Sequence, residues 1–150
     1  MWGKSMTGDR MSHITVTHRN GGVEITSIYA VNEDIAREFG QKHNASGRGL
    51  QAWLEAKGCR LDCSDRPADV RRFATGTLAE TYYRDGKRHR EDGPAVVWRF
   101  ASGSTVEEYY LDDKRHREDG PAYVGRSADG TTEEYYRNGK RHRRGGTGGR

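Results

Sequence analysis

Residues 80–105 read ETYYRDGKRHREDGPAVVWRFASGST, and the chain repeats this stretch twice more. It returns as EEYYLDDKRHREDGPAYVGRSADGTT over residues 107–132 and, in a shorter form, as EEYYRNGKRHRRGG over residues 133–146. The histidines of the three KRHR segments stand at positions 89, 116 and 142, with spacings of 27 and 26 residues. A fixed period of this length is typical of stacked repeats, each of which contacts only its neighbours.

Each copy has the pattern of β structure. Thr, Val and Tyr alternate with charged residues up to a turn pair, which is Asp85-Gly86 in the first copy and Asn138-Gly139 in the third. Pairs of this kind supply the positive φ angles of tight hairpin turns. The Gly-Pro that follows KRHR marks a second bend, because proline is excluded from central strands. The pattern therefore predicts two strands and two turns in every complete copy.

Two adjacent tyrosines precede the turn in every copy, and side chains alternate between the two faces of a strand. We therefore predict two tyrosine rows on opposite faces, one buried, as for Tyr83 and Tyr110, and one forming an aromatic stripe. Packing of both rows against neighbouring side chains is the alternative. Under the first interpretation, the aromatic residues expected to contact a partner are Tyr82, Tyr109, Tyr135 and Trp98.

The string GKRHREDGPA, followed by a β segment and a DG or SG turn, resembles the MORN repeat over residues 77–144. The resemblance is closest to the bacterial and phage variant of this family, and it implies a β-hairpin meander that serves as an interaction scaffold. Two departures stand out. Asp113 replaces the turn glycine of the second copy, and the third copy has Arg144-Gly145-Gly146 in place of EDGPA, which predicts a truncated last repeat.

Residues 13–74 have a different pattern, which predicts a small α+β unit. ITVTHR, NGG and VEITSIYA alternate β-branched with polar residues around a turn, as expected for a β-hairpin. NEDIAREFGQKH follows as a helix with Asn32 as its N-cap. SGRGLQAWLEAKG predicts a second helix with Leu50, Trp53 and Leu54 on one face. The predicted α+β architecture has four parts: a flexible start at 1–12, this unit at 13–74, the β-repeat array at 75–144 and a disordered tail at 145–150.

The predicted helices at residues 32–58 allow two interpretations. DIAREFG resembles the first helix of phage regulator and antirepressor domains, which implies a helix-turn-helix that binds DNA. The second helix would then contact nucleic acid through Arg48, Gln51 and Lys57, although Glu55 lies among them. The alternative is a helical hairpin that packs on the β-hairpin.

Neither the histidines nor the cysteines predict catalysis or a metal site. His89 beside Glu91 could transfer protons, but a catalytic site is single and asymmetric, whereas this histidine recurs in all three copies. Cys59 and Cys63 form a C-x3-C pair, a spacing that fits structural zinc poorly, so ordinary reduced thiols are expected. We expect no cofactor and no enzymatic activity.

Positive charge without neighbouring acids is concentrated in the third copy. The chain has 26 basic and 22 acidic residues, and the acids of each EDG segment screen the preceding KRHR. The third copy lacks these acids, so its basic residues are the candidates for contact with a partner: Arg137, Lys140, Arg141, Arg143 and Arg144. The resemblance to MORN repeats implies a non-catalytic protein-binding module, which we expect to be cytoplasmic.

Several partners fit this expectation. The alternatives are a DNA-binding phage regulator, an inhibitor of a host defence complex and an adaptor for acidic lipids. The truncated third copy would also expose a sheet edge around residues 134–137. That edge predicts a homodimer or strand addition by a partner, unless the nearby basic residues protect it.

Overall fold

A computed structural model of the chain describes residues 11–39 and 47–143. Two helices and fourteen strands form in this part of the chain. The N-terminal elements are β1 (Met11–Asn20), β2 (Val23–Asn32), α1 (Glu33–Phe39), α2 (Gly47–Ala56) and β3 (Arg60–Leu61). The middle elements are β4 (Asp69–Phe73), β5 (Leu78–Thr81), β6 (Tyr83–Arg84), β7 (Lys87–Arg88), β8 (Val96–Arg99) and β9 (Thr105–Glu108). The last elements are β10 (Tyr110–Leu111), β11 (Lys114–Arg115), β12 (Tyr123–Ser127), β13 (Gly130–Arg137) and β14 (Lys140–His142).

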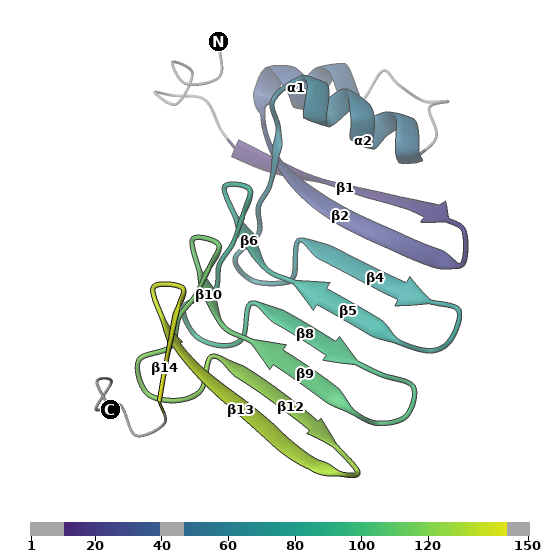
Figure 1. The fold of residues 1–150 in the computed structure, drawn as a ribbon. Helices are drawn as coiled ribbons and strands as arrows, with labels where there is room; N and C mark the ends of the chain where they lie inside the picture. The colour runs from purple at the N-terminus through teal and green to yellow at the C-terminus, as the bar shows by residue number, and fades with distance from the viewer. Residues whose placement is uncertain (1–10, 40–46, 144–150) are drawn as a thin grey trace.

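One antiparallel sheet organises the molecule, in the order β1-β2-β4-β5-β8-β9-β12-β13-β14, with β3 paired to β2. The short hairpins β6–β7 and β10–β11 form separate two-stranded sheets. Figure 1 shows the hairpins of β6, β10 and β14 stacked along one side of the long sheet, and the two helices beyond β1 at the N-terminal end. The predicted α+β class, with an N-terminal hairpin, two helices and a β-meander, is confirmed.

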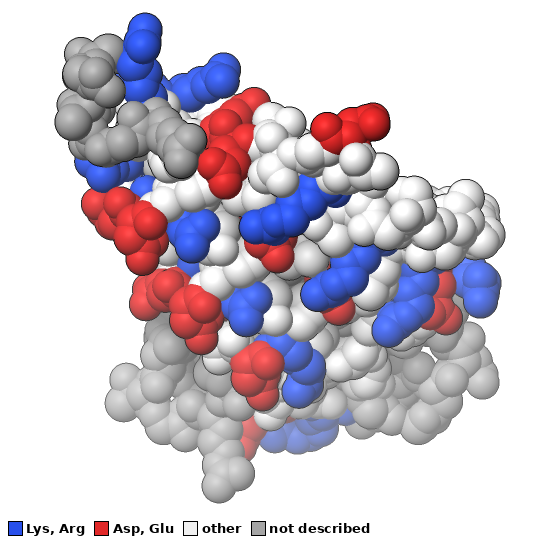
Figure 2. Space-filling view, turned by 90° about the horizontal axis from the view of Figure 1, so that it is seen from below, with Lys and Arg blue, Asp and Glu red and all other residues white. Residues whose placement is uncertain are grey.

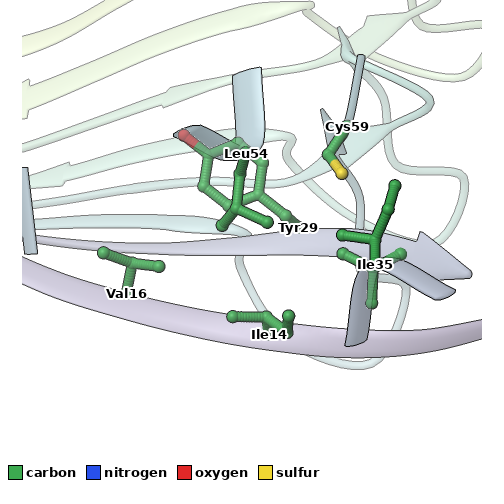
Figure 3. Packing of buried hydrophobic residues seen from close by; sticks show 7 residues of the cluster. Ile14, Val16, Tyr29, Ile35, Leu54 and Cys59 are labelled. Atoms are coloured by element: carbon green, nitrogen blue, oxygen red, sulfur yellow. The ribbon is translucent and has the colours of Figure 1, made fainter. Parts of the chain in front are cut away.

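The two helices pack on the N-terminal hairpin through their apolar residues. Ile14 and Val16 of β1 and Tyr29 of β2 lie beneath Ile35 of α1 and Leu54 of α2 (Figure 3). The Tyr29 hydroxyl donates a 3.0 Å hydrogen bond to a carboxylate oxygen of Glu55. The Asn32 side chain accepts the Ile35 N–H at 2.9 Å, which confirms it as the N-cap of α1.

The repeat array begins earlier than the sequence suggested, inside β2. Pro67-Ala68 precedes Pro94-Ala95 by 27 residues, and FATG at 73–76 precedes FASG at 100–103 by the same interval. Equivalent backbone bonds recur in each layer, because Ala68, Ala95 and Ala122 accept the N–H of Ile28, Tyr82 and Tyr109 at 2.7–2.8 Å. The helices are therefore an insertion between β2 and β3, which pair as Tyr29 with Leu61.

The tyrosine pairs lie where the chain leaves the long sheet. β5 ends at Thr81 and β9 ends at Glu108, so Tyr82 and Tyr109 fall between a long strand and a short hairpin. The prediction of one continuous strand up to the turn is therefore wrong in the first two copies, because the hairpin turns away from the sheet. It holds in the third copy, where β13 continues to Arg137.

The turn chemistry was predicted well. Asp85 and Gly86 have φ angles of 52° and 81°, and Asn138 and Gly139 have 51° and 81°. The second copy forms the same kind of turn with Asp112 and Asp113, at φ angles of 49° and 70°. Asp tolerates this region better than most residues, so the missing glycine does not abolish the turn.

Enlarging a layer alanine should destabilise the fold. Ala95 is fully buried and packs with Val96 and Tyr110, so Ala95→Leu should lower the free energy of unfolding by about 1–3 kcal/mol. Ala101→Leu is the control, because Ala101 is exposed in a turn. Equal midpoints of urea unfolding for the two variants would contradict the assignment of Ala95 to the packed interior.

Candidate interaction surfaces

The repeated histidines join one layer to the next. The His89 Nδ1 accepts the backbone N–H of Asp112 at 3.0 Å, and the His116 Nδ1 accepts that of Asn138 at 2.9 Å. With Nδ1 as acceptor, the ring proton lies on Nε2, which faces Glu91 in the first case at 3.1 Å. Asp62 accepts the N–H of Asp85 at 2.7 Å at the same position of the preceding layer. The histidines thus close turns across layers.

A repeated arginine covers one tyrosine of each pair. The guanidinium carbon of Arg90 lies 4.0 Å from the ring centre of Tyr82, and Arg117 stands equally close to Tyr109. The Arg90 Nη1 also donates to the Pro94 carbonyl at 3.2 Å. A Cβ on Gly93 would lie 3.1 Å from the Arg90 guanidinium carbon, so a larger residue would require the guanidinium group to shift.

The first layer lacks this arrangement of arginine, tyrosine and glycine and has other residues at all three positions. Cys63 stands at the position of Arg90, and Arg66 at the position of Gly93. Cys63 packs with Ile28, which has the place of the tyrosine, and with Ala68. An apolar pair therefore substitutes for the cation–π pair, and no guanidinium group lies where it would crowd a side chain at position 66.

The second tyrosines of the last two pairs, Tyr110 and Tyr136, lie among alternating rings and guanidinium groups, whereas Tyr83 is half-buried against the cluster that contains Cys63. Tyr110 is buried, and the Arg88 guanidinium carbon lies 4.2 Å from its ring centre. Arg115 lies 5.2 Å from the Tyr136 ring and 5.3 Å from the Tyr123 ring. Burial raises the pKa of the Tyr110 hydroxyl, which also donates to Glu108 at 2.9 Å. These contacts make this tyrosine row part of the interior packing.

An aromatic stack lies on the long sheet, formed by Phe73 of β4, Trp98 of β8 and Phe100 just beyond β8. The ring centres of Phe73 and Trp98 are 6.0 Å apart, and those of Trp98 and Phe100 are 5.8 Å apart. Ala79, on the strand between, pairs with Trp98 in register, and its small side chain leaves room for the stack. Phe100 is 38% exposed, and among the described residues no other large hydrophobic side chain is exposed.

A hollow of about 330 Å³ adjoins this stack. Trp98 and Phe73 line it together with Arg71, Arg88 and their acidic neighbours. The Arg71 Nε lies 3.1 Å from the Asp69 carboxylate, and the Arg88 Nε lies 2.9 Å from that of Asp113. The two arginines that line the hollow are thus already paired with carboxylates of the protein.

The structure distributes the predicted partner-binding residues over three environments. Tyr82 and Tyr109 are half-buried beneath arginines, and Tyr135 is half-buried, with its ring centre 6.0 Å from that of His142. Trp98 belongs to the aromatic stack. Arg137 donates to the Glu118 carbonyl at 3.3 Å. The remaining candidates are basic: Lys140, Arg141 and Arg143 are exposed, and Arg144 lies outside the described residues.

Two of the predicted nucleic-acid contacts, Gln51 and Lys57, already interact with acidic side chains of the protein. Gln51 donates to Glu55 at 3.4 Å, and Lys57 lies 3.1 Å from the Glu38 carboxylate and 5.5 Å from the Trp53 ring centre. Arg48 lies in the first turn of α2. DNA binding by this segment stays a prediction.

The two cysteines lie in different hydrophobic clusters, Cys59 under the helices and Cys63 near Ile28. Both are reduced thiols whose pKa is raised by burial. Within residues 11–39 and 47–143, no group of three His, Cys, Asp or Glu side chains could hold a metal ion.

Charged side chains are mixed on the face seen from the C-terminal end of the array, where Figure 2 shows acidic and basic groups side by side. Ion pairs of the described residues include Arg84 with Asp112 at 3.2 Å and Arg117 with Asp119 at 3.4 Å. Exposed pairs of this kind contribute little to stability, but they neutralise the surface. The basic KRHR segments of the first two copies are therefore largely balanced by the protein's own acids.

Comparisons with protein-family models, curated proteins and solved structures found no match. None of the described helices has the length and apolar character needed to cross a membrane.

The stack was missed at the sequence level, although a signal was present. Phe73 and Phe100 occupy the same position in successive copies, 27 residues apart, and Ser127 replaces them in the next copy. The rings come from the region of β4 and of β8, which are not adjacent in the sheet, so their contact could be recognised only once the strand order and register were known.

Removing the acceptor at His89 should cost stability, and an amide should restore it. His89→Ala leaves the Asp112 N–H without its partner, which should lower the free energy of unfolding by about 1–3 kcal/mol. His89→Asn keeps a carbonyl for that N–H and an amide for Glu91, so it should recover much of the loss. Equal destabilisation by both variants, measured by chemical unfolding, would show that the ring's volume matters and the hydrogen bond does not.

Gly93 and Arg90 should be energetically coupled. Gly93→Ala should destabilise the wild-type chain because the new methyl group pushes the guanidinium from the Tyr82 ring. In the Arg90→Ala background the same change should be neutral or stabilising, since it also reduces the freedom of the unfolded chain. We expect a coupling of roughly 0.5–1.5 kcal/mol in the double-mutant cycle. A coupling near zero would refute the stacked arrangement.

Proposed function

We propose that the chain is a non-catalytic protein-binding module, and that a partner protein covers the aromatic stack of Phe73, Trp98 and Phe100. The observation that carries the proposal is the exposure of Phe100 in continuity with Trp98, beside a hollow whose charges are paired internally. Aromatic residues are enriched at the centres of protein interfaces, where a rigid ring buries a large area at small entropic cost.

The use of the repeated polar residues supports a non-catalytic role. His89 has both ring nitrogens engaged, one by the Asp112 N–H and one by Glu91. A general base needs a nitrogen that can reach a substrate. Because the same arrangement recurs at His116, it is better explained as a connection between layers.

The resemblance to MORN repeats supports the same proposal, since it implies a scaffold for interactions. An inhibitor of a host defence complex would be one such binding protein, with a particular target. Acidic lipids and nucleic acid are weaker candidates, because the arginines of the first two copies face acidic neighbours within the protein. Binding to these polyanions should fall steeply with salt, whereas an aromatic contact should persist.

A charge placed on the stack should abolish partner binding without unfolding the protein. The test compares Phe100→Asp with Ala101→Asp, an equal charge on the neighbouring exposed residue. Proteins captured from a host lysate by the immobilised full chain in moderate salt are identified by mass spectrometry. We expect Ala101→Asp to retain the specific partner and Phe100→Asp to lose it by tenfold or more, at unchanged thermal stability. Equal capture by both variants would exclude the stack as the binding site.

A further inference from the structure

The outer edge of β13 is a second distinctive surface. In the described part of the chain, β13 pairs along Gly130–Glu134 with β12 on one side, and no strand pairs with these residues on the other. β14 pairs with residues 135–137, so the open edge is at 130–134 and the predicted edge at 134–137 is wrong. Its counterparts β5 and β9 are each held between two strands. The difference appears in the exposure of side chains, since Gly130–Glu133 are exposed whereas Thr105–Glu108 are all partly buried.

A charge pattern along the sheet indicates what would fit this edge. The Arg99 Nη1 lies 3.0 Å from the Glu80 carboxylate, and the Arg126 Nη1 lies 3.6 Å from that of Glu107. In each case the arginine comes from the next strand of the sheet and sits diagonally across from the glutamate. Each layer thus presents a glutamate that the following strand neutralises.

Glu133 is the next glutamate of this series, and its following strand is missing from the described residues. Its carboxylate has one contact there, a 3.5 Å hydrogen bond from the Tyr135 hydroxyl. The two strands that fill the corresponding places elsewhere read PAVVWR at 94–99 and PAYVGR at 121–126. In the first, Val97 pairs with Glu80, and in the second, Val124 pairs with Glu107. The arginine follows two residues after the valine in both.

We propose that the outer edge of β13 binds an extended strand of another protein by antiparallel strand addition, and that a basic side chain of that strand pairs with Glu133. The backbone groups of residues 130–134 provide the pairing, and the glutamate fixes the register. The partner strand has the pattern Pro-Ala-x-Val-x-Arg, in which valine opposes Glu133 and arginine opposes Thr131. This inference rests on the proposed protein-binding function but uses a surface separate from the aromatic stack.

A second copy of the chain is a poorer occupant. Antiparallel pairing of two β13 edges places Gly-Thr-Thr-Glu-Glu against itself, and this segment contains no basic residue. Each Glu133 would then lack the cation that Glu80 and Glu107 receive. Self-association is accordingly an outcome that would count against the proposal.

The test uses the full chain labelled with ¹⁵N and a capped decapeptide of sequence EDGPAYVGRS as the probe. We expect the peptide to shift the amide signals of residues 130–134 with saturable 1:1 binding. The matched peptide EDGPAYVGES should bind more weakly by roughly fivefold or more, because its glutamate faces Glu133. The chain variant Glu133→Arg should reverse this preference, while Phe100→Asp should leave it unchanged.

The outcomes separate cleanly. No saturable shift at 130–134, or equal affinity for the two peptides, would overturn the proposal, and the peptide comparison does not depend on the folding of any variant. A concentration-dependent dimer in light scattering, with peptide binding blocked, would instead identify a second copy as the occupant. Because Phe100→Asp leaves peptide binding intact, failure of the aromatic stack as an interface would not affect this result.

Discussion

The backbone of the alanine in each Pro-Ala pair holds the array together. The Ala95 carbonyl accepts the Tyr82 N–H at 2.7 Å, while its own N–H donates to the Glu108 carbonyl at 2.8 Å. Ala122 makes the same two bonds with the strands on either side of it. The alanine therefore bridges three consecutive strands, and its complete burial leaves no room for a larger side chain. The proline before it follows the Glu-Asp-Gly segment and directly precedes the alanine that carries this bridge.

The side chains of each layer follow from that spacing. Once the strands are fixed, the Asp112 N–H in the turn of one layer donates a hydrogen bond to His89 of the preceding layer. Arg90 then covers the ring of Tyr82. Thin layers of rings and guanidinium groups then replace the aliphatic core that a chain with so few Leu, Ile, Val and Phe residues cannot form. These polar and aromatic groups satisfy one another inside the array, whereas the two surfaces that we propose for partner binding, the aromatic stack and the outer edge of β13, lie on its surface.

Local patterns predicted the hairpins, the turns and the N-cap at Asn32, because each depends on a few adjacent residues. The degenerate first layer was missed because Asp62 and Cys63 stand where the later copies have the histidine and arginine of KRHR, so only Pro67-Ala68 and FATG mark the 27-residue interval. Pairing of Tyr29 with Leu61 across an inserted pair of helices is a long-range contact with no local signal. Of the three rings in the stack, Trp98 was among the residues predicted to contact a partner and Phe73 and Phe100 were not, since the stack depends on the sheet register. The contacts of Tyr82 and Tyr109 with the arginines that cover them likewise could not be predicted from the sequence pattern alone.

Hydrogen exchange of the turn amides tests the layered arrangement most directly. The N–H groups of Asp85, Asp112 and Asn138 lie in exposed hairpin turns, yet each donates to a side chain of the preceding layer. The account predicts that all three exchange far more slowly than unbonded turn amides, and that His89→Ala removes the protection at Asp112 alone. Exchange of these amides at the rate of an unstructured chain would contradict the account, because the layers would then not be joined through their turns.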